Sequence, residues 1–359
     1  MTTEERRPPR GVEWVDTRIR GRELLDALLH VRIPIEARTF YFGGITMFLF
    51  GVQVVTGTLL ALYYSPTPDA AYDSVQRITS DVAFGWLIRS VHHWAANLMI
   101  LFLALHLGRV FLQAAYKYPR ELTWVVGSGL LLVTIGFGFT GYLLPWDQKA
   151  FWATTVGTEI AGSVPMVGDA LLSLLRGGAD VTGATLSRFF GIHVLVLPLS
   201  LAGLLVIHLV FVHQQGLANP TKPEPRPGTP EALEAHKGRT LPFFPDYILD
   251  EVIAWYVVLG ILVVLASLFP AGLEDKANTL ETPQHIKPEW YFLAVYEALK
   301  LVPRIVGVVG PMIGLVILIL LPFIDRNREV RLRRRPLAAL VGFVVLVAMI
   351  GLTVWGYTS

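Results

Sequence analysis

Long uncharged runs dominate the pattern of hydrophobic and polar positions along the chain. Seven stretches contain no Asp, Glu, Lys or Arg, and no other uncharged run exceeds nine residues. Each is long enough for the roughly 20 apolar residues that carry a helix across the hydrocarbon core of a membrane. The pattern therefore predicts an all-α fold, an integral membrane bundle of seven transmembrane helices. The runs are residues 39–68, 90–108, 122–146, 189–221, 252–273, 305–324 and 336–359.

The composition agrees with this pattern. Of 359 residues, 53% are hydrophobic and 16% charged, and all 58 charged residues (30 basic, 28 acidic) lie outside the seven runs. Because there is no Cys, the chain can hold no disulfide, no cysteine-ligated iron–sulfur cluster and no thioether-attached haem. The net charge of +2 gives no reason to expect a nucleic-acid partner.

The loops predict how the chain crosses the membrane. Residues 1–38 are charged and lack the short apolar core of a cleavable signal, so we expect a cytoplasmic N-terminal segment, with an amphipathic surface helix over 24–37. If the helices then alternate in direction, the cytoplasmic segments hold 21 of the 30 Lys and Arg residues, as the positive-inside rule requires. The expectation is a multi-pass protein of the bacterial cytoplasmic (inner) membrane, in contact with membrane lipids.

The connections between the runs predict a division into domains. A Pro-rich stretch after the fourth run is typical of a solvated linker. Two long outer connections, 145–188 and 270–304, mix aromatic and apolar residues with Pro and Gly, which predicts short helices at the membrane interface. The expected units are a four-helix N-terminal domain over 39–218, a linker over 219–247 and a three-helix C-terminal domain over 248–359.

Four histidines lie at matched depths in two of the runs. His92 and His106 are 14 residues apart, and His193 and His208 are 15 apart; either spacing places both on nearly one helix face, about 21 Å apart along the axis. The two helices run parallel, so His92 faces the level of His193, and His106 that of His208. Facing imidazoles can hold a haem iron axially. Packing or proton relay is the alternative for any single histidine, but the matched set favours two non-covalent b-type haems.

Glycine shows the same spacing. Gly43 and Gly57 in the first run, and Gly127 and Gly141 in the third, are also 14 residues apart. Glycine lets another body approach the backbone closely, which suits either clearance for a flat macrocycle or close helix packing. The shared spacing favours haem clearance.

Two arginines flank the histidines of the second run. Arg89 and Arg109 stand three residues outside His92 and His106, one at each end. They could pair with haem propionates or serve as snorkelling interface anchors, and the spacing alone leaves both open.

Five strings carry a family resemblance, and they are highly specific in combination. They resemble the cytochrome b subunit of the quinol–cytochrome c and plastoquinol–plastocyanin oxidoreductases, especially the plastoquinol branch, although there the two halves are usually separate polypeptides. The strings are FYFGGITMFLFGVQVVTGTLLALYY, RSVHHWAANLMILFLALHLGR, PRELTWVVGSGLLLVTIGFGFTGYLLPWDQ, TLSRFFGIHVLVLPLSLAGLLVIH and KPEWYFLAVYEALKLVP.

The resemblance implies roles for the histidines and a set of partners. His92 and His193 would ligate a low-potential haem on the outer side, and His106 and His208 a high-potential haem on the cytoplasmic side. It also implies a Rieske iron–sulfur protein, a c-type cytochrome or equivalent acceptor subunit, quinone and quinol as substrates, and a dimeric complex.

The resemblance further implies a quinol-oxidation site. The string from Pro288 through Glu289 to Tyr291 matches the family's PEWY motif, in which the carboxylate accepts a quinol proton, and Tyr142 matches a residue that lines that pocket. Read without the resemblance, this string is an interfacial aromatic anchor with a helix-starting acid.

At the cytoplasmic quinone-reduction site the resemblance is mixed. His213, Glu251 and Asp250 fall at family positions of that site, whereas Leu217 stands where a polar Ser is common. The implied function is that of a proton-translocating quinol:cytochrome c (or related acceptor) oxidoreductase. A di-haem membrane anchor for a peripheral dehydrogenase, and a transporter with histidine proton relays, are the alternatives.

Overall fold

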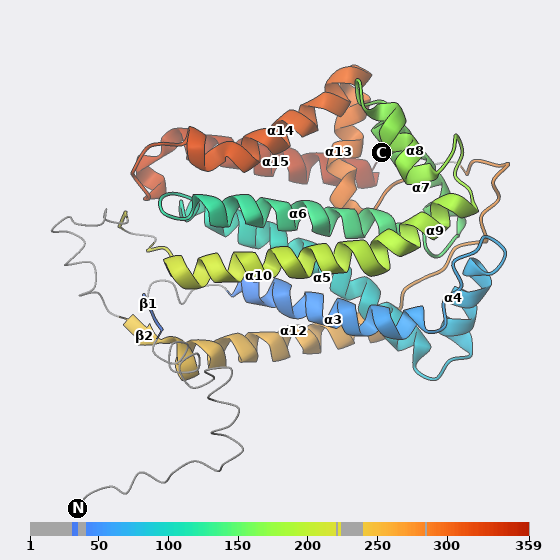
Figure 1. The fold of residues 1–359 in the computed structure, drawn as a ribbon, viewed down its shortest axis with the longest axis horizontal. Coiled ribbons are helices and arrows are strands. Elements are labelled where there is room, and N and C mark those ends of the chain that lie inside the picture. The colour runs from blue at the N-terminus through green and yellow to red at the C-terminus, as the bar shows by residue number, and fades with distance from the viewer. Residues whose placement is uncertain (1–30, 35–40, 220–221, 224–239, 284–285, 359) are drawn as a thin grey trace, which may run out of the picture.

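The computed structural model describes residues 31–34, 41–219, 222–223, 240–283 and 286–358 (Figure 1). Seven helical segments in this part of the chain are long and apolar enough to cross a membrane, and each overlaps one uncharged run, so the predicted bundle is confirmed. The spans are Phe42–Ala61, Gly85–Leu112, Glu121–Tyr142, Gly183–Gln215, Phe243–Leu268, Arg304–Ile324 and Pro336–Thr358.

Two of the spans contain an irregular segment: a wider, π-helical turn in the fourth and a kink in the fifth. The fourth consists of α9 (Gly183–Gly191), the π turn η2 (Ile192–Val196) and α10 (Leu197–Gln215). The fifth begins with η3 (Phe243–Tyr247), a kinked segment in which the backbone of Phe244 is extended, so this span starts before residue 248, the expected start of the C-terminal domain. The other spans are the helices α3 (Phe42–Ala61), α5 (Gly85–Leu112), α6 (Glu121–Tyr142), α12 (Ile248–Leu268), α14 (Arg304–Ile324) and α15 (Pro336–Thr358).

The centre of the bundle is a small apolar core. Helix α3 packs along α5, α12 packs against both, and α6 packs along α10. Leu49, Ala95, Leu201 and Leu262 are buried where α3, α5, α10 and α12 meet. The outer faces carry exposed large apolar side chains, for example Phe343 on α15, as expected of helices whose surroundings are lipid rather than water.

Short helices gather at one end of the bundle (Figure 1). They are α4 (Ala71–Ser80), α7 (Gln148–Gly162), α8 (Gly168–Arg176) and α13 (Trp290–Leu301). The last three lie within the connections 145–188 and 270–304, so the prediction of short helices there is confirmed.

A two-stranded sheet lies at the opposite end (Figure 1). Strand β1 (Arg32–Pro34) pairs antiparallel with β2 (Thr240–Pro242), so the amphipathic helix expected over 24–37 is wrong at 32–34; most of that range lies outside the described residues. The reason is physical: Pro34 disfavours the α-helical conformation of the residue before it, and Ile33 is buried against Leu241.

Polar contacts join the two halves of the chain at both ends of the bundle. At the end with the sheet, Tyr116 donates to Asp325 at 2.5 Å, and Arg335 donates to Tyr116 at 2.6 Å. Burial raises the pKa of Asp325, but the bonds from Tyr116 and Lys117 outweigh it and hold the pKa below its usual value. At the other end, the main-chain N–H of Gln148 donates to the Asp275 carbonyl at 2.9 Å.

Candidate functional site

Two histidine pairs lie inside the bundle, one toward each end. His92 of α5 and His193 of η2 lie close enough to interact electrostatically, and both line a cavity of about 600 Å³. His106 of α5 and His208 of α10 form the second pair. The pairing expected from spacing is therefore the pairing that the fold brings together. We name the two ends after an acidic residue at each: the Glu289 end holds His92 and His193, and the Glu251 end holds His106 and His208.

The π turn η2 explains the unequal histidine spacings. The N–H of Leu197 donates to the carbonyl of Ile192, a wider turn that absorbs one extra residue around His193. Pro198 follows directly and has no N–H to continue the ordinary helical ladder. Fifteen residues on this span thus match fourteen on α5, and both histidine pairs can face each other.

Each of the four spaced glycines lies beside one imidazole of the neighbouring helix. A Cβ atom added at Gly43, Gly57 or Gly127 would lie 3.0, 3.1 or 3.2 Å from the Cε1 atom of His106, His92 or His208, respectively. At Gly141 the distance to His193 Cε1 would be only 2.6 Å. The glycines therefore clear space for the imidazole rings, and contact with a macrocycle stays a prediction.

Two threonines fix the rings at the Glu289 end. Thr56 Oγ1 lies 2.8 Å from His92 Nδ1, and Thr140 Oγ1 lies 3.0 Å from His193 Nδ1. Each hydroxyl gives its only proton to the main-chain carbonyl four residues earlier, so it accepts from the ring. The proton is then on Nδ1, and the lone pair of Nε2 is left for a metal.

The arginines beside the histidines bond to nearby groups. Arg89 donates to the main-chain carbonyls of Ala271 and Gly272 at 2.7 and 2.5 Å, and Arg109 donates to the Gln113 side chain at 3.1 Å. Two of the five N–H groups of Arg89 are thus engaged by the loop that follows α12.

The PEWY residues are held against the first half of the chain. Trp290 Nε1 donates to Asn97 of α5 at 2.7 Å, and the Tyr291 ring packs on Gly138 of α6. Burial, and then the charge of Glu289, raise the pKa of the Tyr291 phenol. Pro288 is half-buried just before them.

Glu289 is the N-terminal cap residue of α13, but its side chain makes no cap hydrogen bond. The carboxylate instead accepts from Lys149 Nζ at 3.1 Å. Glu289, Tyr291, Tyr142 and Lys149 all line the cavity that contains His92 and His193. The buried Tyr142 hydroxyl has no hydrogen-bond partner among the described residues. A helix-starting acid alone does not account for this arrangement.

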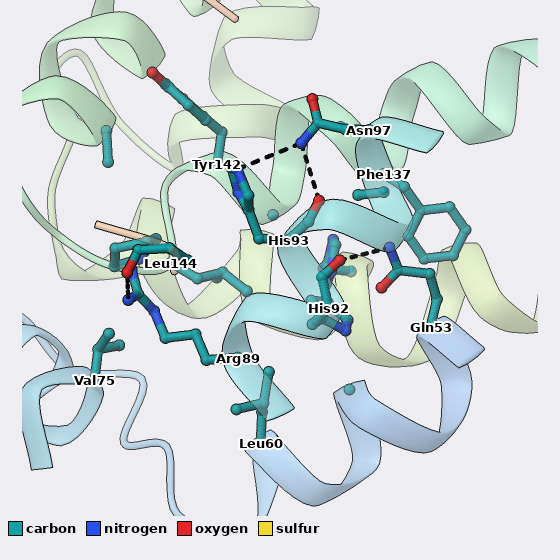
Figure 2. A pocket seen from close by; sticks show the side chains of 18 of the residues that line it. Gln53, Leu60, Val75, Arg89, His92, His93, Asn97, Phe137, Tyr142 and Leu144 are labelled. Atoms are coloured by element: carbon teal, nitrogen blue, oxygen red, sulfur yellow. Dashed lines mark hydrogen bonds between the residues drawn. The ribbon is translucent and has the colours of Figure 1, made fainter. Parts of the chain in front are cut away.

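Figure 2 shows the wall of this cavity that α5 forms. Arg89, His92, His93 and Asn97 follow one another along the helix, and Gln53 of α3 donates to the main-chain carbonyl of His92 at 2.9 Å.

At the Glu251 end the residues are packed tightly. A Cβ added at Gly44 would lie 1.5 Å from Glu251 Oε1, so that carboxylate lies directly on the α3 backbone. Asp250 accepts from the Tyr41 hydroxyl at 2.9 Å. His213 is exposed near the end of α10, and within the described residues no hydrogen bond or ion pair joins it to Glu251.

The donor set fits haem better than a metal held by protein alone. Among the described residues no group of three or more His, Cys, Asp or Glu side chains could hold a metal ion. A haem needs only two axial protein ligands, because the macrocycle supplies the other four nitrogens. Two half-buried histidine pairs, one with Nε2 left open by threonine bonds, match that requirement.

Sequence reasoning missed several residues of these sites. Thr56 and Thr140 each directly precede a spaced glycine, and this repeated Thr-Gly pair was a readable signal. Gly44 stands beside Gly43 and had no separate signal. Lys149 lies 140 residues from Glu289 along the chain, and only the fold brings the two together.

The chain matches two known families and several proteins. Residues 30–216 match the family described as "Cytochrome b/b6/petB", and residues 276–359 match "Cytochrome b(C-terminal)/b6/petD". A cytochrome bc complex cytochrome b subunit of Chlorobaculum thiosulfatiphilum is 41% identical over 91% of this chain and 76% of its own length. A cytochrome b6 of Heliobacterium mobile is 45% identical over 58% of this chain and 100% of its own.

A solved structure of a "Hyperthermophilic respiratory Complex III" is also similar. It aligns with a TM-score of 0.83 and 33% identity, over 96% of this chain and 91% of that one. The resemblance therefore extends through both halves of the chain.

Proposed function

The chain belongs to the cytochrome b/b6 family, with the N- and C-terminal parts in one polypeptide, and on this premise we propose which residues carry out its reaction. It is the cytochrome b subunit of a cytochrome bc complex and takes part in quinol oxidation and electron transfer. The observation that carries the assignment of residues is the pair of facing histidines at each end of the bundle, with a glycine beside every ring.

His92 and His193 hold one b haem, of low potential, and His106 and His208 hold a second, of high potential. When bound, the haems carry single electrons between the two ends of the bundle. Thr56 and Thr140, by accepting from Nδ1, would leave Nε2 of the first pair available to ligate the haem iron. We assign Arg89 and Arg109, one near each pair, to the haem propionates. Arg89 has N–H groups left to donate beyond its two bonds to main-chain carbonyls.

Quinol oxidation takes place in the cavity at the Glu289 end. Quinol loses a proton with each electron, so a base within hydrogen-bond reach is required, and the Glu289 carboxylate lines the cavity without capping its helix. Pro288 and Tyr291 fix the segment that carries Glu289. The buried Tyr142 hydroxyl, which has no partner among the described residues, is available to bond a bound quinol.

Quinone reduction takes place at the Glu251 end. Glu251 and Asp250 lie near the second histidine pair through their contacts with Gly44 and Tyr41, and they can deliver protons there. His213, exposed on α10, supplies protons from outside the bundle.

The membrane orientation and the partners complete the proposal. The Glu251 end and the N-terminus face the cytoplasm of a bacterium, and the Glu289 end faces outward. One quinol electron leaves to a Rieske iron–sulfur protein and then a c-type cytochrome or equivalent subunit, within a dimeric complex. One relative named above is a cytochrome bc complex subunit and the similar solved structure is a respiratory Complex III, which favours this function over a di-haem anchor or a transporter.

A redox titration of the purified complex tests the haem assignment. We expect two b-type centres of different potential, and a single b haem would contradict the two-pair proposal.

Replacing Glu289 with Gln should slow quinol oxidation by about 100-fold, the lower range for loss of a general base, without changing either haem spectrum. An unchanged rate would remove the role given to Glu289.

A further inference from the structure

We propose that Lys149 is a positioning residue of the quinol-oxidation site, whose ammonium group holds the Glu289 carboxylate directed into the cavity. This inference rests on the proposed role of Glu289 in proton acceptance. It concerns a residue outside the PEWY string, on a different helix and in the other half of the chain.

The placement of Lys149 is the first observation. It is the second residue of α7, two residues after the cap residue Asp147, whose carboxylate accepts from the Ala150 N–H at 2.9 Å. The N-terminus of a helix carries a partial positive charge, so a lysine there is disfavoured unless an acid compensates. Besides the cap carboxylate of Asp147, Lys149 has the carboxylate of Glu289, whose Oε1 atom lies 3.1 Å from its Nζ atom.

The second observation is that the two basic side chains of the cavity have different partners. These side chains are Arg89 and Lys149, the arginine and the lysine that line the cavity. Arg89 gives both of its terminal nitrogens to the main-chain carbonyls of Ala271 and Gly272. Lys149 alone of the two is paired with a carboxylate, and its Nζ atom also lies 5.7 Å from the centre of the Tyr142 ring.

The rigidity of the surroundings is the third observation. The turn before α7 is bonded to the segment that precedes the PEWY string: Ala277 N–H donates to the Trp146 carbonyl at 3.2 Å, and Asp147 and Lys276 form a β-bridge. Trp290 is anchored to Asn97 on α5. The turn before Lys149 is therefore bonded to the segment that leads toward Glu289, and the residue after Glu289 is anchored to α5.

These contacts lead to a simple electrostatic role. A neighbouring ammonium group favours the ionised form of a carboxylate, which is the form able to take a proton from quinol. Once Glu289 is protonated its charge is lost, and so is the attraction to Lys149, so the neutral acid is free to turn away. The side chains are 36% and 22% exposed, which keeps the coupling moderate. The other titratable groups that line the same cavity are Arg89, His92 and His93 of α5, Tyr142 of α6, His193 of η2, Tyr291 of α13, Tyr64, Asp147 and Glu274.

The test is the pH dependence of quinol oxidation by the intact complex, with a short-chain quinol and the complex's own acceptor chain. In Lys149→Met the ionised carboxylate loses its support, so the acid limb of the profile should move to higher pH. The rate near pH 6 should fall by on the order of fivefold, while the rate at alkaline pH stays close to wild type. Lys149→Arg should restore the wild-type profile.

Lys276 offers a matched control. It also forms an ion pair with an acid, Asp73 at 3.2 Å, and lies over a tyrosine ring, that of Tyr72 at 6.0 Å. Lys276→Met should leave the profile unchanged. In a Glu289→Gln background, Lys149→Met should add no further pH-dependent loss.

The outcomes separate this inference from the function on which it rests. If Glu289→Gln is slow but Lys149→Met matches wild type at every pH, the role of Lys149 is wrong and that of Glu289 stands. If Lys149→Met lowers the rate equally at all pH values, or alters the haem spectra, Lys149 is only structural and the inference is overturned. If Glu289→Gln is as fast as wild type, both fail.

Discussion

The two ends of the bundle each hold a pair of histidines but support the imidazole rings differently. At the Glu289 end each histidine ring bonds to a threonine, Thr56 or Thr140, one residue before a glycine. At the Glu251 end the equivalent positions are Phe42 and Val126, which have no hydroxyl. His106 Nδ1 is buried without a hydrogen-bond partner in the described part of the chain. Similar spacing along the chain thus produces two sites that differ in what lies behind the rings.

The difference extends to the acids of the two ends. Glu289 lines a cavity and is held by a lysine from the other half of the chain. Glu251 is pressed against the backbone of α3 at Gly44. The first arrangement leaves room for a substrate and for movement of the carboxylate, whereas the second restricts the carboxylate to one place.

The largest expected effect comes from filling the space beside the rings. In Gly141→Ala the new Cβ would lie 2.6 Å from His193 Cε1, well inside the roughly 3.5 Å at which carbon atoms pack, so the ring must move and its haem should be lost or become labile. Gly127→Ala, at 3.2 Å from His208, should retain more of its haem. Haem content per complex and redox titration measure both, and equal losses would contradict the ranking.

A smaller effect is expected from moving one acid. In Gly44→Ala the Cβ would occupy the position of Glu251 Oε1, and because that atom ends a flexible side chain, the carboxylate should move while the fold persists. We expect quinone reduction to slow by roughly tenfold, with both haems retained, which is less than the roughly 100-fold for loss of a proton-transfer group because the carboxylate is displaced and not removed. Gly51→Ala, which has open space around it, is the control. A normal rate in Gly44→Ala would show that the position of Glu251 is unimportant.

The smallest effect concerns the threonines. A bond from Nδ1–H to a threonine makes the imidazole more electron-rich and favours ferric iron, so Thr56→Val with Thr140→Val should raise the potential at the Glu289 end. One neutral hydrogen bond is worth about 1 kcal/mol, so the rise should not exceed about 40 mV for each bond and one electron. The potential at the Glu251 end serves as the internal reference and should not change. A fall in potential, or a shift at the wrong end, would reject this explanation.

The spans were predictable because lipid excludes charge, and that rule acts on each residue separately. The level of each histidine was predictable because the rise per residue of a helix is regular. The π turn at His193 was not predicted, although the spacing of 15 and Pro198 both pointed to an irregular helix. The helix expected over 24–37 was wrong at 32–34 because pairing with Thr240–Pro242 depends on distant residues. The contacts of Lys149 and Gly44 were not predictable, since each joins positions far apart in the chain.

The polar junctions between the halves have a consequence for how such a subunit is assembled. The bonds of Tyr116 with Asp325 and of Gln148 with Asp275 connect groups on either side of residues 219–239, and they need no covalent link between them. The Heliobacterium mobile relative corresponds over its full length to 58% of this chain. A linker over residues 219–239 would raise the local concentration of one half near the other, so that an encounter between two membrane polypeptides becomes an intramolecular one. Splitting the gene within residues 219–239 should lower the yield of assembled subunit at low expression, while the contacts between the halves stay the same.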